Sequence, residues 1–447
     1  VSAFIEHSGA LASGRRRFGG LLRFMSYSER LFLTELFNAA VSAADPKMAL
    51  SRFLPVKPKG RTVVIGAGKG AAQLASAFEE LWDGPLSGVV VTRYGFAAPC
   101  QHIEVLEASH PVPDAAGLAA SAALFEAVGG LGPDDLVVAL ICGGGSSLLP
   151  APVAGLSLSD EIALNRALLA SGAPISAMNV IRKQISQIKG GQLARAAAPA
   201  KVVSLIVSDV PGDDPAQVAS GPTVGDASGP ADALAAIRTY DIELPPNIQN
   251  FIESLPRTAP ATEPVTGNEV HIIASANKSL EAAAEVAAAQ GIPAVVLSDS
   301  IEGEAREIAK MHAAIAGQIA DRDRPFSAPV VLLSGGETTV TIAGPGGRGG
   351  RNTEFLLSFA REIEGRKNIY ALAADTDGID GSEDNAGAFC DGLSCAEMRG
   401  VGTDPSDALL GHDAWSAFQA IDSLFVSGPT GTNVNDFRAV YISSDQT

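Results

Sequence analysis

The chain lacks the residue patterns of disulfide-stapled, zinc-binding and membrane-spanning proteins. Its 447 residues include only four cysteines, and these form no CxxC pair and no Cys/His group at zinc-site spacing. The cysteines are Cys100, Cys142, Cys390 and Cys395. No apolar run reaches the ~18 residues of a membrane helix. We therefore expect free thiols, a reducing cytoplasmic location and no membrane association.

Basic residues are also scarce. The chain has 32 Lys and Arg against 50 Asp and Glu, a net charge of −18. Such an acidic chain is a poor candidate for nonspecific binding to nucleic acid or to anionic membranes. A hydrophobic share of 46% excludes a disordered chain. An anionic small molecule would have to be held by glycine loops and a few placed cations.

The length and the hydrophobic pattern predict two α/β domains in series. Near-continuous apolar runs alternate with helical segments, which is typical of a parallel sheet covered on both faces. A Pro- and Thr-rich stretch predicts a boundary, giving an N-terminal domain over 28–265 and a C-terminal domain over 266–447. An irregular, basic lead-in fills 1–27, and we expect the working chain to begin near Met25.

The glycine loop Gly66–Gly70, GAGKG, closes the first apolar run. It is not a Walker A loop, but Gly66, Gly68 and Ala71 fit the dinucleotide pattern G-x-G-x-x-A. The acid expected about 20 residues later is missing, since the second run ends VVVTRYG. Lys69 lies at the start of the next helix, where a cation is unfavourable unless an anion binds beside it. A solvated lysine in a packing turn is the structural alternative.

Two more loops of the first half carry polar groups at the ends of apolar runs. Cys142–Ser147, CGGGSS, combines three glycines with two hydroxyls, which suits a phosphate or a carboxylate as well as a tight turn. Ser208–Asp214, SDVPGDD, holds three acids. Helix capping, metal binding and exposure to solvent are the alternative interpretations of these acids. His110, in SHPVPD, we interpret as a structural histidine.

The second half repeats this arrangement. Glu337 follows a glycine pair at a strand end, and Gly344–Glu354 places two arginines in a glycine-rich loop that opens a helix. Flexible backbone with guanidinium groups suits an anion clamp, or simply a surface loop. Asp375 and Asp377 miss the calcium-loop pattern but could hold Mg²⁺ beside phosphates. No G-x-S-x-G elbow is present, so the inventory favours phosphoryl transfer over Ser-His-Asp hydrolysis.

Motifs along nearly the whole chain resemble the class II glycerate kinases, a family also named hydroxypyruvate reductase. They are GAGKG, SHPVPD, CGGGSS, IRKQISQIKGGQLA, SDVPGDDPAQVASGPT, SGGETTV, GGRNTE, AADTDGIDG and GPTGTNVND. The resemblance implies two α/β domains, the first Rossmann-like with a mostly parallel sheet, and an active site in the interdomain cleft. It also implies an ATP- and Mg²⁺-dependent kinase that phosphorylates D-glycerate at the 2-hydroxyl.

On this resemblance the important lysine falls on Lys69 and the important arginine on Arg351. Thr353 stands where the family often has Gln, and Gln184 where it often has His. The candidate ligand-binding residues are Gly66, Gly68, Gly143, Gly144, Gly145, Ser146, Ser147, Gly335, Glu337 and Asn352. The candidate Mg²⁺ ligands are Asp209, Asp375 and Asp377.

Two other functions stay open. An NAD(P)H-dependent hydroxypyruvate reductase would use the G-x-G-x-x-A loop, although it leaves Lys69 and the acidic loops unexplained. A non-enzymatic nucleotide sensor would bind ATP without consuming it. The sequence is compatible with a homodimer.

Overall fold

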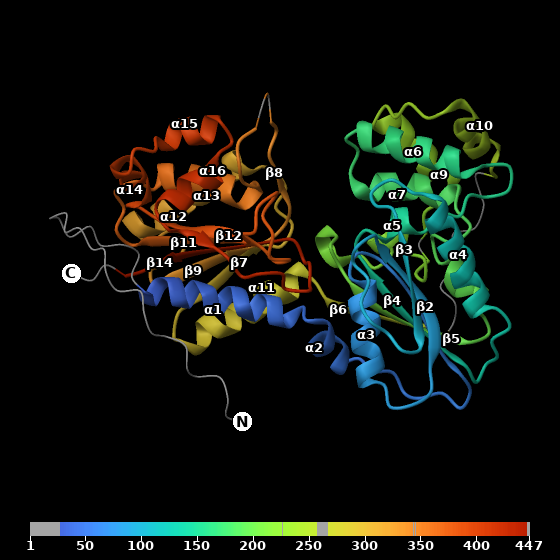
Figure 1. Cartoon of the computed structure of the whole chain (residues 1–447). Coiled ribbons are helices and arrows are strands. Elements are labelled where there is room, and N and C mark those ends of the chain that lie inside the picture. Colours follow the sequence, from blue (N-terminus) through green and yellow to red (C-terminus); the bar gives the residue numbers. More distant parts are fainter. Residues whose placement is uncertain (1–26, 226, 257–266, 343, 345, 445–447) are drawn as a thin grey trace.

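The computed structural model describes residues 27–225, 227–256, 267–342, 344 and 346–444. Two six-stranded sheets lie side by side, each with helices on both faces (Figure 1). We call the part built on the sheet of β1 to β6 the first unit and the other part the second unit. The predicted pair of α/β domains is confirmed. The lead-in up to residue 26, with the expected start at Met25, lies outside the described residues.

The first sheet is wholly parallel, in the order β3-β2-β1-β4-β5-β6. Its strands are β1 (Thr62–Ala67), β2 (Ser87–Arg93), β3 (Ile103–Ala108), β4 (Leu136–Cys142), β5 (Lys201–Val207) and β6 (Glu269–Ala274). The chain moves outward from β1 to β3 and then returns to the other side of β1. The loops after β1 and β4 therefore diverge from a topological switch point, where open α/β sheets bind ligands.

Alternate residues of the first sheet feed two cores. Val63 and Ile65 of β1 pack in the layer of α4 (Ala115–Val128), whereas Val64 packs with α3 (Ala71–Leu81). The other helices are α2 (Pro46–Ser51), α5 (Gly145–Leu148), α6 (Leu158–Ala170), α7 (Ile175–Gln184), α8 (Gln192–Ala196), α9 (Pro230–Thr239) and α10 (Pro246–Ser254), with 3₁₀ turns η1 (Pro211–Asp213) and η2 (Val218–Ser220). Helices α6, α7, α9 and α10 share a separate apolar cluster at the top of this unit (Figure 1).

The second sheet is mixed rather than parallel, in the order β13-β12-β11-β14-β9-β7. Its strands are β7 (Ala294–Ser298), β9 (Val330–Ser334), β11 (Ile369–Asp375), β12 (Gly387–Asp391), β13 (Leu424–Phe425) and β14 (Asp436–Ile442), and β8 (Gly303–Glu304) pairs separately with β10 (Thr338–Thr339). Among the neighbouring strand pairs of this sheet in the described residues, β7 and β9 are the one parallel pair. Strand β14 lies antiparallel between β9 and β11, so it begins at the edge where those two strands end.

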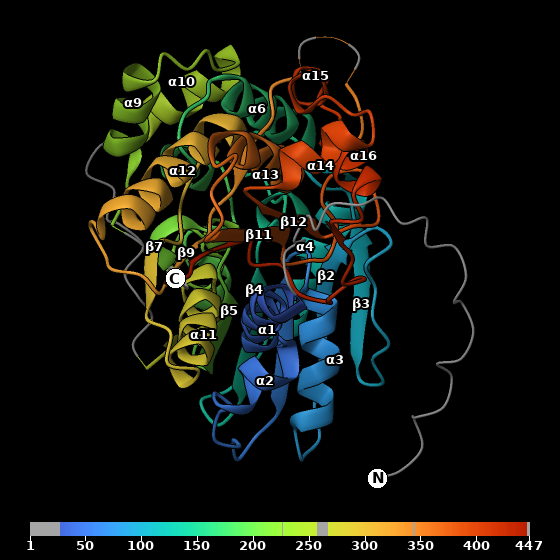
Figure 2. The same cartoon turned by 90° about the vertical axis from the view of Figure 1, so that its left-hand side faces the viewer.

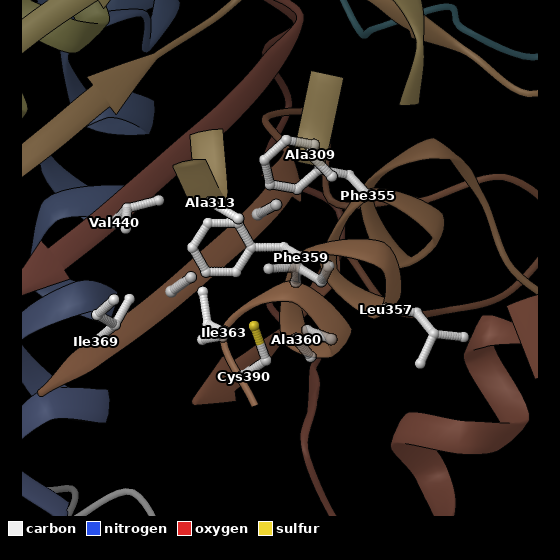
Figure 3. Close-up of a cluster of buried hydrophobic side chains, with 14 of the residues drawn as sticks. Ala309, Ala313, Phe355, Leu357, Phe359, Ala360, Ile363, Ile369, Cys390 and Val440 are labelled. Atoms are coloured by element: carbon white, nitrogen blue, oxygen red, sulfur yellow. The ribbon is translucent and has the colours of Figure 1, made fainter. Parts of the chain in front are cut away.

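Helices cover both faces of the second sheet (Figure 2). One face carries α1 (Tyr27–Ala43) and α11 (Ala276–Ala289), and the other carries α12 (Ala305–Arg322), α13 (Arg351–Glu362), α14 (Ser394–Gly400), α15 (Pro405–Leu410) and α16 (Ala414–Ala420). Figure 3 shows Phe355 and Phe359 of α13 directed into the core beside Ala309 and Ala313 of α12. The two rings stack with centroids 6.0 Å apart. This packing fixes the start of α13, where the candidate arginine lies.

The predicted domain limits do not coincide with the division of the sheets. Helix α1 precedes the first unit in sequence but packs on α11 of the second. Strand β6 follows the predicted boundary but pairs with β5 of the first unit. An amphipathic pattern predicts a helix or a strand, but it does not identify which sheet the element joins. The boundary at 265/266 itself lies outside the described residues.

The stretch from Ile175 to Ala197 forms two helices rather than one. Helix α7 ends at Gln184 and α8 begins at Gln192. Between them, Gly190 and Gly191 take φ of 62° and 80°, in the left-handed region that only glycine enters easily. In the described parts of the chain, no helix combines the length and the apolar character that a bilayer span requires.

Candidate active site

The glycine loops after β1 and β4 meet at the switch point of the first sheet. The backbone N–H of Lys69 donates to the carbonyl oxygen of Gly143 at 2.8 Å. Gly68 has a φ of 136°, and a Cβ there would overlap Cys142. The glycines therefore let the two loops touch, and they place Lys69 beside the second loop.

Lys69 and His110 both adjoin the backbone of Gly144. A side chain on Gly144 would collide with the aliphatic part of Lys69 and with Nε2 of His110. Burial and, to a smaller extent, the positive charges of Lys69 and Arg93 together lower the pKa of His110 to about 4. His110 is therefore neutral near pH 7. The sequence analysis treated it as structural, although SHPVPD follows β3 at the same edge of the sheet.

Asp209 is the buried acid of this edge. Its carboxylate occupies the space that a side chain on Gly143 would fill. Burial raises the pKa of Asp209, Lys69 opposes the shift, and Glu337 of the second unit adds to it. Lys69 and, from the second unit, Glu337 therefore both lie close enough to Asp209 to act on its carboxylate electrostatically.

Arg351 is the first residue of α13 and binds three carboxylates with three different nitrogens. Nε lies 2.6 Å from Asp436 Oδ1, Nη2 lies 2.7 Å from Asp375 Oδ2, and Nη1 lies 3.0 Å from Glu337 Oε1. Burial alone would lower the pKa of Arg351, but the carboxylates of Asp436 and Asp375 raise it well above its usual value. The three acids come from the ends of β9 and β11 and the start of β14, which share one edge of the sheet.

Asp436 and Arg438 form a buried support that the sequence analysis did not identify. The Arg438 side chain is fully buried, and its Nη2 lies 2.5 Å from Asp436 Oδ2. Its Nη1 donates to the carbonyl oxygen of Gly335 at 3.1 Å. The charged D-x-R pattern at the start of an apolar strand was the available signal, because buried charges are rarely unpaired.

The start of α13 is fixed by Asp380. Its carboxylate accepts hydrogen bonds from the backbone N–H groups of Asn352 and Thr353, each at 2.9 Å. The Thr353 hydroxyl donates to the Asp380 carboxylate at 2.9 Å. Thr353 stands where the family often has Gln, and this bond gives the threonine a structural role. Asn352 Nδ2 donates to Asp436 Oδ1 at 2.8 Å, so the side chain of this candidate ligand-binding residue holds the Asp436 carboxylate in place. Ligand binding by Asn352 stays a prediction.

A cavity of about 800 Å³ opens beside Arg351 in the second unit. Its lining combines acids with an apolar side, including Glu302, Glu337, Val340, Ile342 and His412. Deeper in the wall, Glu354 Oε1 lies 2.5 Å from Arg306 Nη2 and 3.1 Å from His412 Nδ1. The cavity therefore offers room for a small molecule, and the guanidinium group of Arg351 places a positive charge at one end of it.

The candidate metal ligands are only partly brought together. Asp375 Oδ1 accepts a hydrogen bond from the backbone N–H of Asp377 at 3.0 Å, and burial raises the pKa of Asp375 well above its usual value. Asp209 belongs to the other unit. Within the described residues, no three His, Cys, Asp or Glu side chains are grouped to hold a metal ion. This donor set fits Mg²⁺ that arrives with phosphates, since such an ion needs only one or two carboxylates.

The other sequence candidates lie in different surroundings. Ser146 is half-buried and Ser147 is buried, with its hydroxyl bonded to the carbonyl of Gly144 at 3.3 Å. Gln184 donates to the carbonyl of Val180 within its own helix, so its replacement of His adds no contact to the site. Arg348, the other loop arginine, stacks 3.5 Å from the ring centroid of Trp415 and pairs with Glu383, away from the three acids.

Two family models match the chain. A domain of unknown function, DUF4147, matches residues 32–253, and the MOFRL family matches residues 330–436. The first match lies in α1 and the first unit, and the second contains Glu337, Arg351, Asp375 and Asp436.

Individual relatives carry names that state an activity. A D-glycerate 2-kinase of Thermotoga maritima is 38% identical over 90% of this chain and 95% of its own. An Agrobacterium vitis protein, provisionally named hydroxypyruvate reductase, is 53% identical over 93% of this chain and 95% of its own. The crystal structure of glycerate kinase from Thermotoga maritima matches with a TM-score of 0.85 and 36% identity, over 93% of this chain and all of that one.

Proposed function

Because the chain belongs to the glycerate kinase family and is a glycerate kinase, we propose that it transfers the γ-phosphoryl group of ATP to the 2-hydroxyl of D-glycerate with the help of Mg²⁺. The product would be 2-phosphoglycerate. One observation carries the proposal: cations and acids of both units lie near the loops through which the units touch, where Asn435 donates to the carbonyl of Asp209. Glu337, which binds Arg351, also influences the buried Asp209 beside Lys69.

The two substrates fit different sides of this junction. The cavity of about 800 Å³ in the second unit lies in the size range of small-molecule sites, and Val340 and Ile342 offer an apolar surface to a nucleotide base. We assign this cavity to ATP. Glycerate then binds at the loops of the first unit, where Lys69 lies along Gly144 and provides a cation for its carboxylate.

The metal would be held by residues at the edge of the second sheet. Asp375, Asp377 and Glu337 supply oxygen ligands of the kind Mg²⁺ prefers, and Asp209 faces them from the first unit. When bound, Mg²⁺ neutralises charge on the phosphates of ATP. Arg351 keeps the acids in place, since each of its three bonding nitrogens reaches a different carboxylate.

Phosphoryl transfer depends mainly on positioning and on charge. Lys69 and Arg351 reach the junction from opposite units, so both can stabilise charge that develops on the moving group. Bringing the two edges together excludes water, which limits wasteful hydrolysis of ATP. The neutral His110 beside Lys69 can exchange a hydrogen bond with the substrate without adding charge.

ADP release tests this function. The purified protein is incubated with ATP, Mg²⁺ and D-glycerate, and ADP is followed by a coupled assay. We expect release that requires glycerate and ceases when the metal is chelated. Release at the same rate without glycerate would indicate an ATPase, and no release would remove the kinase proposal.

A reductase is the second candidate because the first sheet has the strand order of dinucleotide-binding folds. A similar protein also carries the name hydroxypyruvate reductase. The acid that would bind a ribose is absent where β2 ends, at Thr92 and Arg93. A parallel reaction with NADH or NADPH and hydroxypyruvate decides between the two. Oxidation there without ADP release in the kinase reaction would favour the reductase.

We infer the compartment from the thiols. All four cysteines are free in the structure, and three of them are buried. Free cysteines are typical of a reducing compartment, which supports our proposal that the enzyme acts in the cytoplasm.

A further inference from the structure

A chain of buried hydrogen bonds runs from Arg182 of α7 to the glycine loop after β4. Arg182 Nη1 donates to Asn179 Oδ1 at 3.0 Å. The hydroxyl of Ser220 donates to the same oxygen at 2.9 Å. Ser220 Oγ lies 2.6 Å from Ser146 Oγ. Asn179 and Ser220 are fully buried, whereas Ser146 is half-buried, so the chain leads from the interior to the surface of the site.

The direction of every bond in this chain is fixed by Arg182. A guanidinium has donors only, so the Asn179 atom that faces it must be the oxygen. Asn179 Nδ2 confirms this orientation, because it faces two acceptors, the carbonyl oxygen and Oε1 of Gln217, at 3.0 and 3.1 Å. Ser220 must then use its only proton on Asn179 Oδ1. Ser146 is left to donate its proton to Ser220.

Ser146 therefore offers a ligand its lone pairs and no proton. This reverses the role expected of a hydroxyl in a glycine loop, which is to donate to phosphate. Phosphate and carboxylate oxygens are acceptors near pH 7, so neither gains a hydrogen bond from Ser146 in this state. A hydroxyl group of a ligand does.

The backbone around Ser220 is held in an uncommon conformation. Ala219 and Ser220 have φ of 52° and 62°, in the left-handed region that non-glycine residues seldom adopt. Ala219 packs against Gly145, where a Cβ would overlap it. Such local strain persists only where surrounding contacts enforce it, and it is common at ligand sites. Here it brings the Ser220 hydroxyl to Ser146.

We propose that Ser146 accepts a hydrogen bond from the 3-hydroxyl of glycerate and so helps to select this substrate. The proposal rests on the proposed function. Lys69 lies over Gly144, two residues before Ser146. Its ammonium group supplies the positive charge that binds the carboxylate of the same glycerate molecule. The 2-hydroxyl must face ATP to receive the phosphoryl group. The 3-hydroxyl is then the donor left for Ser146.

Two analogues that each lack one hydroxyl test the assignment. D-lactate lacks the 3-hydroxyl, and 3-hydroxypropanoate lacks the 2-hydroxyl. Each is measured as a competitive inhibitor against glycerate in the wild type and in Ser146→Ala. We expect the inhibition constant of 3-hydroxypropanoate to rise about tenfold in the variant, as the loss of one hydrogen bond predicts. The constant of D-lactate should change less than about twofold, because D-lactate never makes that bond.

Two further variants separate this role from damage to the loop. Ser147→Ala removes the neighbouring hydroxyl, whose one partner among the described residues is the carbonyl of Gly144 in the same loop, so it should shift both inhibition constants by the same factor. Ser220→Gly removes the acceptor of the Ser146 proton and fits a φ of 62° without strain. It should weaken the binding of 3-hydroxypropanoate more than that of D-lactate, because the Ser146 hydroxyl is then no longer held with its lone pairs toward the ligand.

Four results would overturn the proposal. They are equal shifts of both constants in Ser146→Ala, no shift of either, a rise confined to the KM for ATP, and a rise confined to the Mg²⁺ requirement. The third would make Ser146 a phosphate donor and the fourth a metal ligand. Failure of the proposed function is recognised separately, since the wild type would then show no glycerate-dependent release of ADP.

Discussion

Asn435 Nδ2 donates a hydrogen bond to the backbone carbonyl of Asp209 at 3.2 Å, and this bond joins the two units. The carbonyl of Asn435 itself accepts from the backbone and hydroxyl of Thr376, at 3.2 and 2.7 Å. Asn435 has a φ of 68°, a conformation that asparagine tolerates better than most residues. The contact ties the loop before β14 to the loop after β5, which are the two edges that carry the candidate site.

Removing the charge of Lys69 should nearly abolish turnover. In Lys69→Met, we expect kcat to fall about 10³-fold, the order found when a cation is removed from a transferring phosphoryl group. Initial rates of glycerate-dependent ADP release measure it. Lys57→Met is the matched control, since Lys57 forms an exposed pair with Asp83 at 2.9 Å. A Lys69→Met enzyme as active as this control would exclude Lys69 from the reaction.

Arg351→Lys keeps a positive charge but loses the geometry. One ammonium cannot replace three nitrogens that bond to three acids in different directions. We expect kcat to fall about 10²-fold and the melting temperature to drop. Arg348→Lys, in the same loop but bonded to Glu383, should change kcat less than about twofold because it lies away from the acids. Equal effects of the two variants would contradict the role given to Arg351.

Asp380→Ala should weaken both the fold and the activity. It removes the carboxylate that accepts the first N–H groups of α13, at a cost of about 2 kcal/mol, and so releases Arg351. Denaturant unfolding and kcat are measured together. Asp404→Ala removes an exposed cap of α15, where we expect a smaller loss of stability with kcat unchanged. Loss of stability without loss of kcat in Asp380→Ala would show that the start of α13 does not control the site.

The buried histidines predict an acid limb in the stability profile. Burial lowers the pKa of His110 and of His312 to about 4, so the unfolded chain takes up their protons at higher pH than the folded one. Their contribution to stability is present above the ordinary pKa of ~6.5 and is lost as the pH falls toward 4. Urea unfolding between pH 7 and 4 should show a shallower decline in His110→Gln than in the wild type. An unchanged slope would mean that His110 is not held neutral.

The sequence predicted which local segments carry the site residues better than it predicted which residues those segments contact. Each glycine loop follows an apolar run, so the pattern could place Lys69, Asp209, Glu337 and Asp375 at strand ends. The convergence of β9, β11 and β14 on Arg351 depends on β14 lying antiparallel between the other two. Strand order and direction are properties of the whole sheet, and no local spacing encodes them.

The supporting residues were missed for a related reason. Asp380 is one of three aspartates in the motif AADTDGIDG, and Arg438 follows Asp436 in what looks like a polar loop entering a strand. Their importance comes from burial: Arg438 is fully enclosed, and Asp380 accepts from the backbone N–H of Asn352, 28 residues earlier, at the start of a helix. Pairing across such a distance becomes visible only once the helix has been placed against the sheet.

The most direct test of the whole account is the phosphorus NMR spectrum of the reaction mixture, recorded without proton decoupling. A phosphate on carbon 2 of glycerate couples to one proton and gives a doublet, whereas a phosphate on carbon 3 couples to two and gives a triplet. We predict that the γ-phosphate signal of ATP is replaced by a doublet and the signals of ADP. A triplet, or inorganic phosphate alone, would contradict transfer to the 2-hydroxyl of glycerate between the two units.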